Sequence, residues 1–339
     1  MAPSDEGTNT PMAHARIPAQ AISNAVALAC RAPSVHNSQP WHLVVRDGAV
    51  RLYLQPHRVP HATDHSGREA VISCGALLDH LRAAAAVAGW HAAVARFPNP
   101  NDLDHLATVT FSPAELVTEG DRARADAILR RRTDRLPFAA PPNWTVLEPL
   151  LRSAIDPDLA TLHVLADGVR PQLAEASRLT ESLRRYDQSY QAELQWWTSP
   201  FEVADGVPFS ALVSPSERHR TAVARTFPDG GQQNRRTTVP ADRSVIVVLS
   251  TDGDSRREAL GCGEALSALL LEATLAGLAT CTLTHLTELD ASRDIVRALT
   301  GADDDPQVLV RIGRVPALDE VPPATPRRPL GEVLEFAGG

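Results

Sequence analysis

The chain has 339 residues, of which 43% are hydrophobic and 22% are charged, and its formal net charge is −8. A chain of this length forms one large domain or two ordinary ones. The sequence has no apolar run close to the roughly 18 residues of a membrane helix, and its acidic balance argues against a nucleic-acid partner while it allows a basic pocket for one small anion. The four cysteines form no Cys-x-x-Cys pair, which suits a reducing cytoplasm. We therefore expect a soluble cytoplasmic protein without a membrane or nucleic-acid partner.

The N-terminal part of the chain predicts a tail followed by one α+β unit. Residues 1–20 are polar and contain three prolines, so we expect a disordered tail. Asp47-Gly48 separates two short apolar runs, a pattern typical of a β-hairpin. We place the first half of the protein at residues 21–118, with helices at 23–31 and 68–89, a hairpin at 42–54, and strands at 91–97 and 106–112.

The second half, residues 119–339, follows a boundary at 111–120 and has a similar composition. The residues between about 198 and 240 are rich in proline and glycine but keep apolar side chains, which favours a lid over a site. The alternative is a packed excursion that only completes the core. Each half becomes an α+β layer with a mixed sheet. In the second half we expect helices at 144–155, 171–197, 257–277 and 292–299, and strands at 163–168, 243–250 and 307–312.

The chain contains an internal repeat. Cys74-Gly75 followed by Gly89 has the same spacing as Cys262-Gly263 followed by Gly277, and both stretches are rich in alanine and leucine at helical spacing. A strand and a turn precede each stretch in the same order. We interpret the two stretches as equivalent long central helices of two tandem halves.

The loop at residues 31–41 reads Arg-Ala-Pro-Ser-Val-His-Asn-Ser-Gln-Pro-Trp. Its prolines favour an extended path, and the hydroxyl and amide groups of Ser34, Asn37 and Gln39 are spaced to suit a flat polar ligand. The loop therefore predicts a cofactor contact. The alternative is an ordinary turn that carries a core tryptophan, Trp41.

A basic cluster at residues 130–135, Arg-Arg-Arg-Thr-Asp-Arg, opens the second half and has no counterpart in the first. Guanidinium groups form charge-assisted and often bidentate bonds to phosphate oxygens, and Thr133 adds a hydroxyl donor. The cluster predicts a phosphate site, with a solvated helix end as the alternative. Three histidines, His57, His61 and His65, recur at helical spacing, but Pro56 and Pro60 interrupt such a helix, so we expect no metal site there.

Several of these motifs resemble the signatures of the nitroreductase-like FMN flavoproteins. They are Pro-Ser-x-x-Asn-x-Gln-Pro-Trp at 33–41, Arg-Arg-Thr-Asp-Arg-Leu-Pro-Phe at 131–138, and Pro-Arg-Arg-Pro at 326–329. With two complementary halves, the set resembles the Acg-type branch of that superfamily, a fused pseudo-dimer. The resemblance implies a three-layer nitroreductase-like α+β fold with two tandem halves and one FMN per chain.

Roles for individual residues also follow from this resemblance. Arg131, Thr133, Arg327 and Arg328 would hold the phosphate and ribityl chain, and Arg135 would lie near flavin N1 and O2. Thr284 and His285 would occupy the N5 side, where ordinary nitroreductases have an acidic residue and glycine. The full set of expected FMN contacts is Pro33, Ser34, Val35, Asn37, Gln39, Arg131, Arg132, Thr133, Arg135, Thr284, His285, Arg327 and Arg328.

Two functions compete on this basis. The first is an NAD(P)H-dependent oxidoreductase that passes a hydride through flavin N5 to an electron-poor acceptor such as a nitroaromatic or quinone. Because the flavin carries this chemistry, no catalytic acid-base pair is expected from the protein. The second is a non-catalytic protein that stores or sequesters FMN under the lid, and a scaffold without cofactor is a third reading. We expect a monomer, and a further homodimer stays open.

Overall fold

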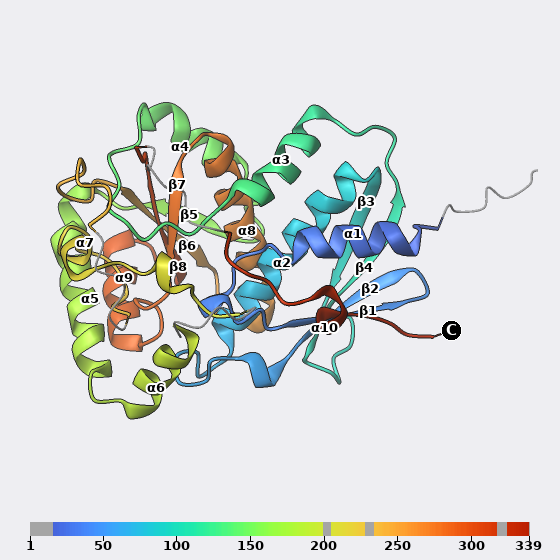
Figure 1. The fold of residues 1–339 in the computed structure, drawn as a ribbon, viewed down its shortest axis with the longest axis horizontal. Helices are drawn as coiled ribbons and strands as arrows, with labels where there is room; N and C mark the ends of the chain where they lie inside the picture. The colour runs from blue at the N-terminus through green and yellow to red at the C-terminus, as the bar shows by residue number, and fades with distance from the viewer. Residues whose placement is uncertain (1–15, 199–204, 228–233, 317–323, 339) are drawn as a thin grey trace, which may run out of the picture.

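The computed structural model describes residues 16–198, 205–227, 234–316 and 324–338. These residues form two α+β lobes with two long helices between them (Figure 1). The sheet of the first lobe has the strand order β3-β4-β2-β1-β9, and the sheet of the second has the order β5-β6-β8-β7. The strands are β1 Trp41–Arg46, β2 Ala49–Leu54, β3 Trp90–Arg96, β4 His105–Pro113, β5 Thr161–Val164, β6 Val245–Thr251, β7 Ala279–Leu283, β8 Asp305–Gly313 and β9 Leu334–Phe336.

Helix α2 packs against β2 and β3 of the first sheet and α1 packs against α2, while the helices of the second lobe flank the other sheet (Figure 1). Most lie within a few residues of the ranges expected from periodicity. They are α1 Ala19–Ala29, α2 Arg68–Val87, α3 Glu119–Arg130, α4 Trp144–Ser153, α5 Arg170–Arg184, α6 Gln188–Trp197, α7 Pro215–His219, α8 Arg256–Leu275, α9 Asp290–Thr300 and α10 Leu330–Val333.

The long helix expected at 171–197 is in fact two helices, α5 and α6. Asp187 lies between them, and its side chain accepts a hydrogen bond from the backbone N–H of Tyr190 at 3.0 Å. Aspartate favours this N-cap position because its carboxylate satisfies an amide that the helix leaves unpaired. The sequence therefore contained the signal that starts the second helix.

The first sheet contains the expected hairpin and one strand that was not expected. Strands β1 and β2 pair in register from Trp41 with Leu54, and both turn residues, Asp47 and Gly48, have positive φ, as a two-residue hairpin turn requires. Strand β9, from the C-terminal end of the chain, adds to this sheet parallel to β1. The first sheet is therefore mixed. The second sheet pairs only antiparallel strands, so the mixed sheet expected there was wrong.

Helices α2 and α8 cross between the lobes at the two repeated glycines. A Cβ on Gly75 would lie 2.0 Å from the carbonyl oxygen of Leu260, and a Cβ on Gly263 would lie 2.0 Å from that of Ile72. Only glycine allows backbones this close. The two contacts are reciprocal, because the glycines and their contact residues occupy equivalent positions in the repeat. The crossing lies within a continuous apolar core that joins both lobes.

The two ends of the chain both differ from the sequence expectation. Helix α1 begins at Ala19 and Ile17 is buried, so the tail expected over residues 1–20 ends before Ile17. Residues 1–15 lie outside the described residues. The last segment leaves the second lobe and ends against the first (Figure 1). By length and composition α2 could cross a membrane, but 83% of its apolar window is buried inside the protein, as in a core helix.

Candidate functional site

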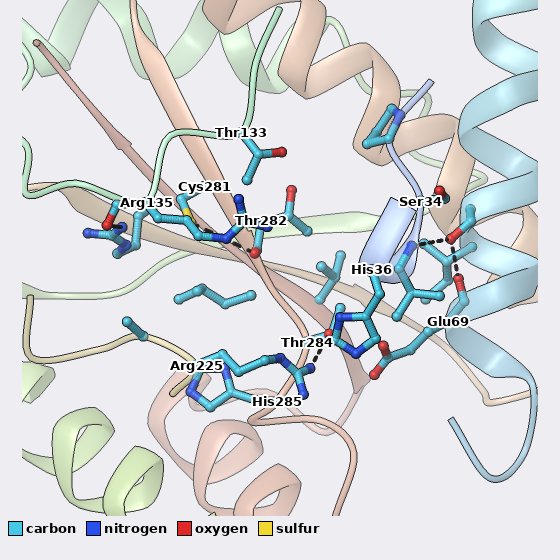
Figure 2. Close-up of a pocket in the computed structure, with 18 of the residues that line it drawn as sticks. Ser34, His36, Glu69, Thr133, Arg135, Arg225, Cys281, Thr282, Thr284 and His285 are labelled. Carbon is cyan, nitrogen blue, oxygen red and sulfur yellow. Dashed lines mark hydrogen bonds between the residues drawn. The ribbon is translucent and has the colours of Figure 1, made fainter. Parts of the chain in front are cut away.

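A cavity lies between the loop before β1, helix α2 and the edge of the second sheet at β7. Its empty space is about 920 Å³, including its open mouth. Figure 2 shows Ser34, His36 and Glu69 on one side of it, and Thr133, Arg135 and Thr282 on the other. We call this cavity the inner chamber. Both lobes therefore contribute its walls.

The wall from the first lobe is a loop with an uncommon backbone. His36, Asn37 and Gln39 have φ of +48°, +56° and +49°, a region that non-glycine residues rarely adopt and that clusters at functional sites. Side chains hold the loop in this shape: the hydroxyl of Ser73 accepts from the amide of Val35 at 3.0 Å. The loop is therefore a rigid surface presented to the chamber.

Asn37 also joins the loop to two segments that are distant in sequence. Its side-chain amide donates to the carbonyl oxygen of Gly206 at 3.0 Å and to that of Pro326 at 3.2 Å. The first acceptor belongs to the segment expected to be a lid and the second to the C-terminal segment. The three segments are thereby tied together at the edge of the site.

A second, smaller cavity adjoins the inner chamber and shares four lining residues with it. Its empty space is about 530 Å³, and we call it the basic chamber. Its cationic lining comes from both lobes and from the C-terminal segment. The shared residues are Pro33, Ser34, Thr133 and Arg135, and the arginines of the basic chamber are Arg31, Arg131, Arg132, Arg135 and Arg327.

These arginines repel one another, and in the described part of the chain no carboxylate is ion-paired with Arg31, Arg131, Arg132 or Arg327. Burial, with Arg31 and Arg132 nearby, lowers the pKa of Arg131 to about 10, and its Nε has no hydrogen-bond partner. Burial, with Arg131 and Arg31 nearby, lowers the pKa of Arg327 to about 9. An anion bound here would offset both effects.

Local structure explains how two of these arginines reach the chamber. Helix α3 ends at Arg130, and the chain then runs beside β7, where Thr133 forms a bridge with Thr280. The guanidinium of Arg327 donates to the carbonyl oxygens of Cys30, at 2.9 Å, and Arg31, at 3.0 Å. These carbonyls follow the end of α1, where a helix attracts cations.

The inner chamber has a buried carboxyl group in its wall. Glu69 is 2% exposed, and neither carboxyl oxygen has a hydrogen-bond partner. Burial, together with Glu288 and Asp64, raises the pKa of Glu69 well above its ordinary value. The imidazole of His36 lines the same chamber, and burial lowers its pKa well below the usual range. Burial therefore disfavours the charged form of both groups.

Residues of the segment between α7 and β6 cover the chamber. Arg225 donates to the hydroxyls of Tyr190 at 2.8 Å and Thr284 at 3.0 Å, and it forms a buried ion pair with Glu288. The ring of Phe227 lies 5.2 Å from the Arg135 guanidinium carbon. Val213, Ala224, Arg225 and Phe227 all line the inner chamber. Of the expected lid, residues 199–204 and 228–233 lie outside the described residues.

The structure brings eleven of the thirteen expected contact residues to the two chambers. Pro33, Ser34, Val35, Thr133, Arg135, Thr284 and His285 line the inner chamber, and Asn37, Arg131, Arg132 and Arg327 line the basic chamber. The other two line neither. Arg328 instead donates to Gln55 at 3.0 Å and to the backbone carbonyl oxygen of Glu332 at 2.9 Å, and the side-chain Oε1 of Gln39 accepts from the backbone N–H of Arg328 at 2.9 Å. Both anchor the C-terminal segment, and their expected contacts with phosphate or flavin stay predictions.

Among the lining residues that were not expected, five have a charged or imidazole side chain: Arg31, His36, Glu69, Arg225 and Arg311. His36 is inside the motif that drew attention to the loop, so only its role was missed. Glu69 precedes the first repeated glycine by six positions on α2, and Arg225 lies in the expected lid. No local pattern distinguishes a chamber-facing arginine from a surface one. For the histidines at 57, 61 and 65, the described residues contain no group of three or more His, Cys, Asp or Glu side chains placed to hold a metal ion.

Two α+β lobes thus share a cavity that continues into a chamber lined by arginines. Residues 114–314 match the model of the nitroreductase family, and the chain belongs to this family. The resemblance read from the motifs is thereby confirmed.

Curated relatives cover nearly the whole chain. "Putative NAD(P)H nitroreductase acg" of Mycobacterium tuberculosis (strain ATCC 25618 / H37Rv) is 58% identical over 313 residues, which are 92% of this chain and 95% of that protein. "Uncharacterized protein Rv3127" of the same strain is 57% identical over 319 residues, 93% of each chain. Among solved structures, the FMN-dependent nitroreductase NfnB from Mycobacterium smegmatis in complex with NADPH has a TM-score of 0.39 at 17% identity, covering 65% of this chain and 100% of that one.

Proposed function

We propose that this chain is an FMN-binding, NAD(P)H-dependent oxidoreductase with one FMN held between its two halves. The observation that carries the proposal is the pair of joined chambers, one walled by both lobes and one lined by arginines that have no ion-paired carboxylate among the described residues. Membership of the nitroreductase family and the name of the M. tuberculosis relative support it. FMN, when bound, supplies the two-electron chemistry.

The residues of this chain would hold that cofactor from both lobes. Arg131, Arg132 and Thr133 are suited to the phosphate, and half-buried Arg327 adds positive charge beside them. Arg135 lines both chambers and is suited to an electron-rich edge of the ring. The loop containing Ser34 approaches from the other lobe. The reciprocal α2–α8 contact and the internal repeat support a fused pseudo-dimer in which residues 21–118 and 119–339 keep one site between them.

The test is a visible absorption spectrum of the purified protein before and after NADPH is added without oxygen. We expect a flavin spectrum that bleaches with NADPH and returns when a quinone or nitroaromatic acceptor is added. Colourless protein that fails to bind added FMN would contradict the cofactor assignment. Flavin that no nicotinamide cofactor reduces would contradict the oxidoreductase.

One observation favours a second function, the storage of FMN under a closed lid. Arg225 lines the inner chamber and is held in place by contacts with Tyr190, Thr284 and Glu288. A buried ion pair therefore fixes the segment that contains Arg225 over the chamber. Slow release of FMN with negligible NAD(P)H turnover would support storage. Saturable NAD(P)H oxidation would exclude it.

A further inference from the structure

A third cavity lies on the far side of the wall that Arg225 and His285 form. It is bounded by α5, α6 and the residues around Arg218, and its empty space is about 1020 Å³. We call it the outer chamber. It shares Ala224, Arg225, Phe227 and His285 with the inner chamber. The two chambers are therefore neighbours separated by side chains.

The outer chamber is cationic. Four arginines line it against a single glutamate, Glu181. Arg225 is neutralised by its ion pair with Glu288, whereas Arg185 is exposed and has no ion pair among the described residues. Of the remaining two, Arg184 pairs with Asp187 through one nitrogen, and Arg218 donates to a backbone carbonyl oxygen. They come from different helices, α5 and α7.

These two arginines also have donors that the protein does not use. Arg184 is 5% exposed; its Nη1 donates to Asp187 at 3.0 Å, and its Nε and Nη2 have no hydrogen-bond partner. Its guanidinium carbon lies 4.8 Å from the centre of the Tyr190 ring. Arg218 donates to the carbonyl of Phe227 at 3.0 Å, and its Nε is also buried without a partner. Buried unpaired donors are costly, and a ligand with several acceptor oxygens would satisfy them.

We propose that the outer chamber binds a phosphate monoester and that, within the proposed function, this group is the 2′-phosphate that distinguishes NADPH from NADH. A phosphate monoester carries up to two negative charges and three acceptor oxygens, which match guanidinium forks from two elements better than one carboxylate does. The chamber has room for the nucleoside that carries the group. Its shared wall places such a ligand beside the cavity assigned to FMN.

The experiment measures binding of NADP⁺, NAD⁺ and inorganic phosphate to the oxidised holoprotein by calorimetry at constant ionic strength, which avoids turnover. We expect NADP⁺ to bind at least about 10-fold more tightly than NAD⁺, as the loss of one charge-assisted hydrogen bond implies. Arg184→Gln and Arg218→Gln should each remove most of this preference without changing NAD⁺ binding. Arg178→Gln is the matched control, because Arg178 is an exposed residue of the same helix paired with Glu175.

The outcomes separate this inference from the proposed function. Phosphate binding that Arg218→Gln abolishes, with equal affinity for the two dinucleotides, supports the phosphate site and excludes the nicotinamide cofactor as its source. Equal affinities with no phosphate binding, or variants that behave like the wild type, overturn the site. Arg184→Lys, which keeps the charge but loses the fork, replaces Arg184→Gln if that variant does not fold. Loss of the flavin spectrum or of its reduction by NADH bears on the proposed function alone.

Discussion

The basic chamber shows how single residues acquire their properties from neighbours. Arg131 is buried, has an unpaired Nε and lies near two further arginines, all of which lower its pKa. An isolated surface arginine would have none of these features. Such a cluster is unfavourable by itself, and a bound dianion would turn the repulsion into attraction.

Arg131→Ala should therefore weaken FMN binding by about 10-fold or more, the effect of losing one charge-assisted contact. Arg130→Ala is the control, because Arg130 is the exposed neighbour at the end of α3. Flavin content after dialysis, followed by titration with FMN, measures the difference. Full flavin retention in Arg131→Ala would contradict the phosphate assignment.

Glu69 gives a prediction about pH. Its pKa in the folded protein is raised by burial and then by Glu288 and Asp64. The pKa of this side chain in the unfolded chain is about 4.3. At pH values between these two pKa values, the native state binds more protons than the unfolded state. Stability from this group is therefore lost as the pH rises. Glu69→Gln should gain stability over the wild type between pH 5 and pH 8, measured by urea unfolding of the protein without FMN.

The control for that measurement is Glu175→Gln, which changes an exposed carboxylate. It should leave the pH dependence as in the wild type. A Glu69→Gln difference that stays constant from pH 5 to pH 8 would show that Glu69 is ionised throughout this range.

At the scale of elements, the crossing of α2 and α8 depends on two residues without side chains. A Cβ atom added to Gly75 or to Gly263 would lie too close to a carbonyl oxygen of the facing helix. The repeat was visible in the sequence, and its helices were predicted correctly. Their mutual contact was not, because a pattern along one helix does not specify which helix it meets.

Gly75→Ala should destabilise the protein by about 3 kcal/mol or more, because the methyl group would have to push two backbones apart. Gly168→Ala is the control, since nothing lies within 4 Å of a Cβ added at Gly168. The midpoint and slope of urea unfolding measure both. If Gly75→Ala unfolds at the wild-type midpoint, the close crossing is wrong.

At the scale of the whole molecule, the inner chamber and the basic chamber are each lined by segments from both lobes. The C-terminal segment brings Arg327 to the carbonyls of Cys30 and Arg31, and then adds β9 to the first sheet. The apolar core likewise continues from one lobe into the other. Neither half buries its central helix without the other.

We therefore expect the full chain to unfold in a single cooperative transition, with residues 16–118 alone failing to form a stable fold. Scanning calorimetry of the full chain and circular dichroism of the fragment measure this. Two separate transitions, or a fragment that melts cooperatively, would show that the first lobe is independent of the second.

The sequence by itself determined the family, the long central helices, the hairpin at Asp47-Gly48, and eleven of the residues that line the two chambers. These follow from local periodicity, turn chemistry and short motifs, which are written in consecutive residues. Only the tertiary structure decided that Arg328 and Gln39 serve the C-terminal segment, that Glu69 lies unpaired in a chamber wall, and that Arg184 and Arg218 face one cavity. These facts depend on contacts between distant residues, and burial and charge at such contacts have no signature in the local sequence.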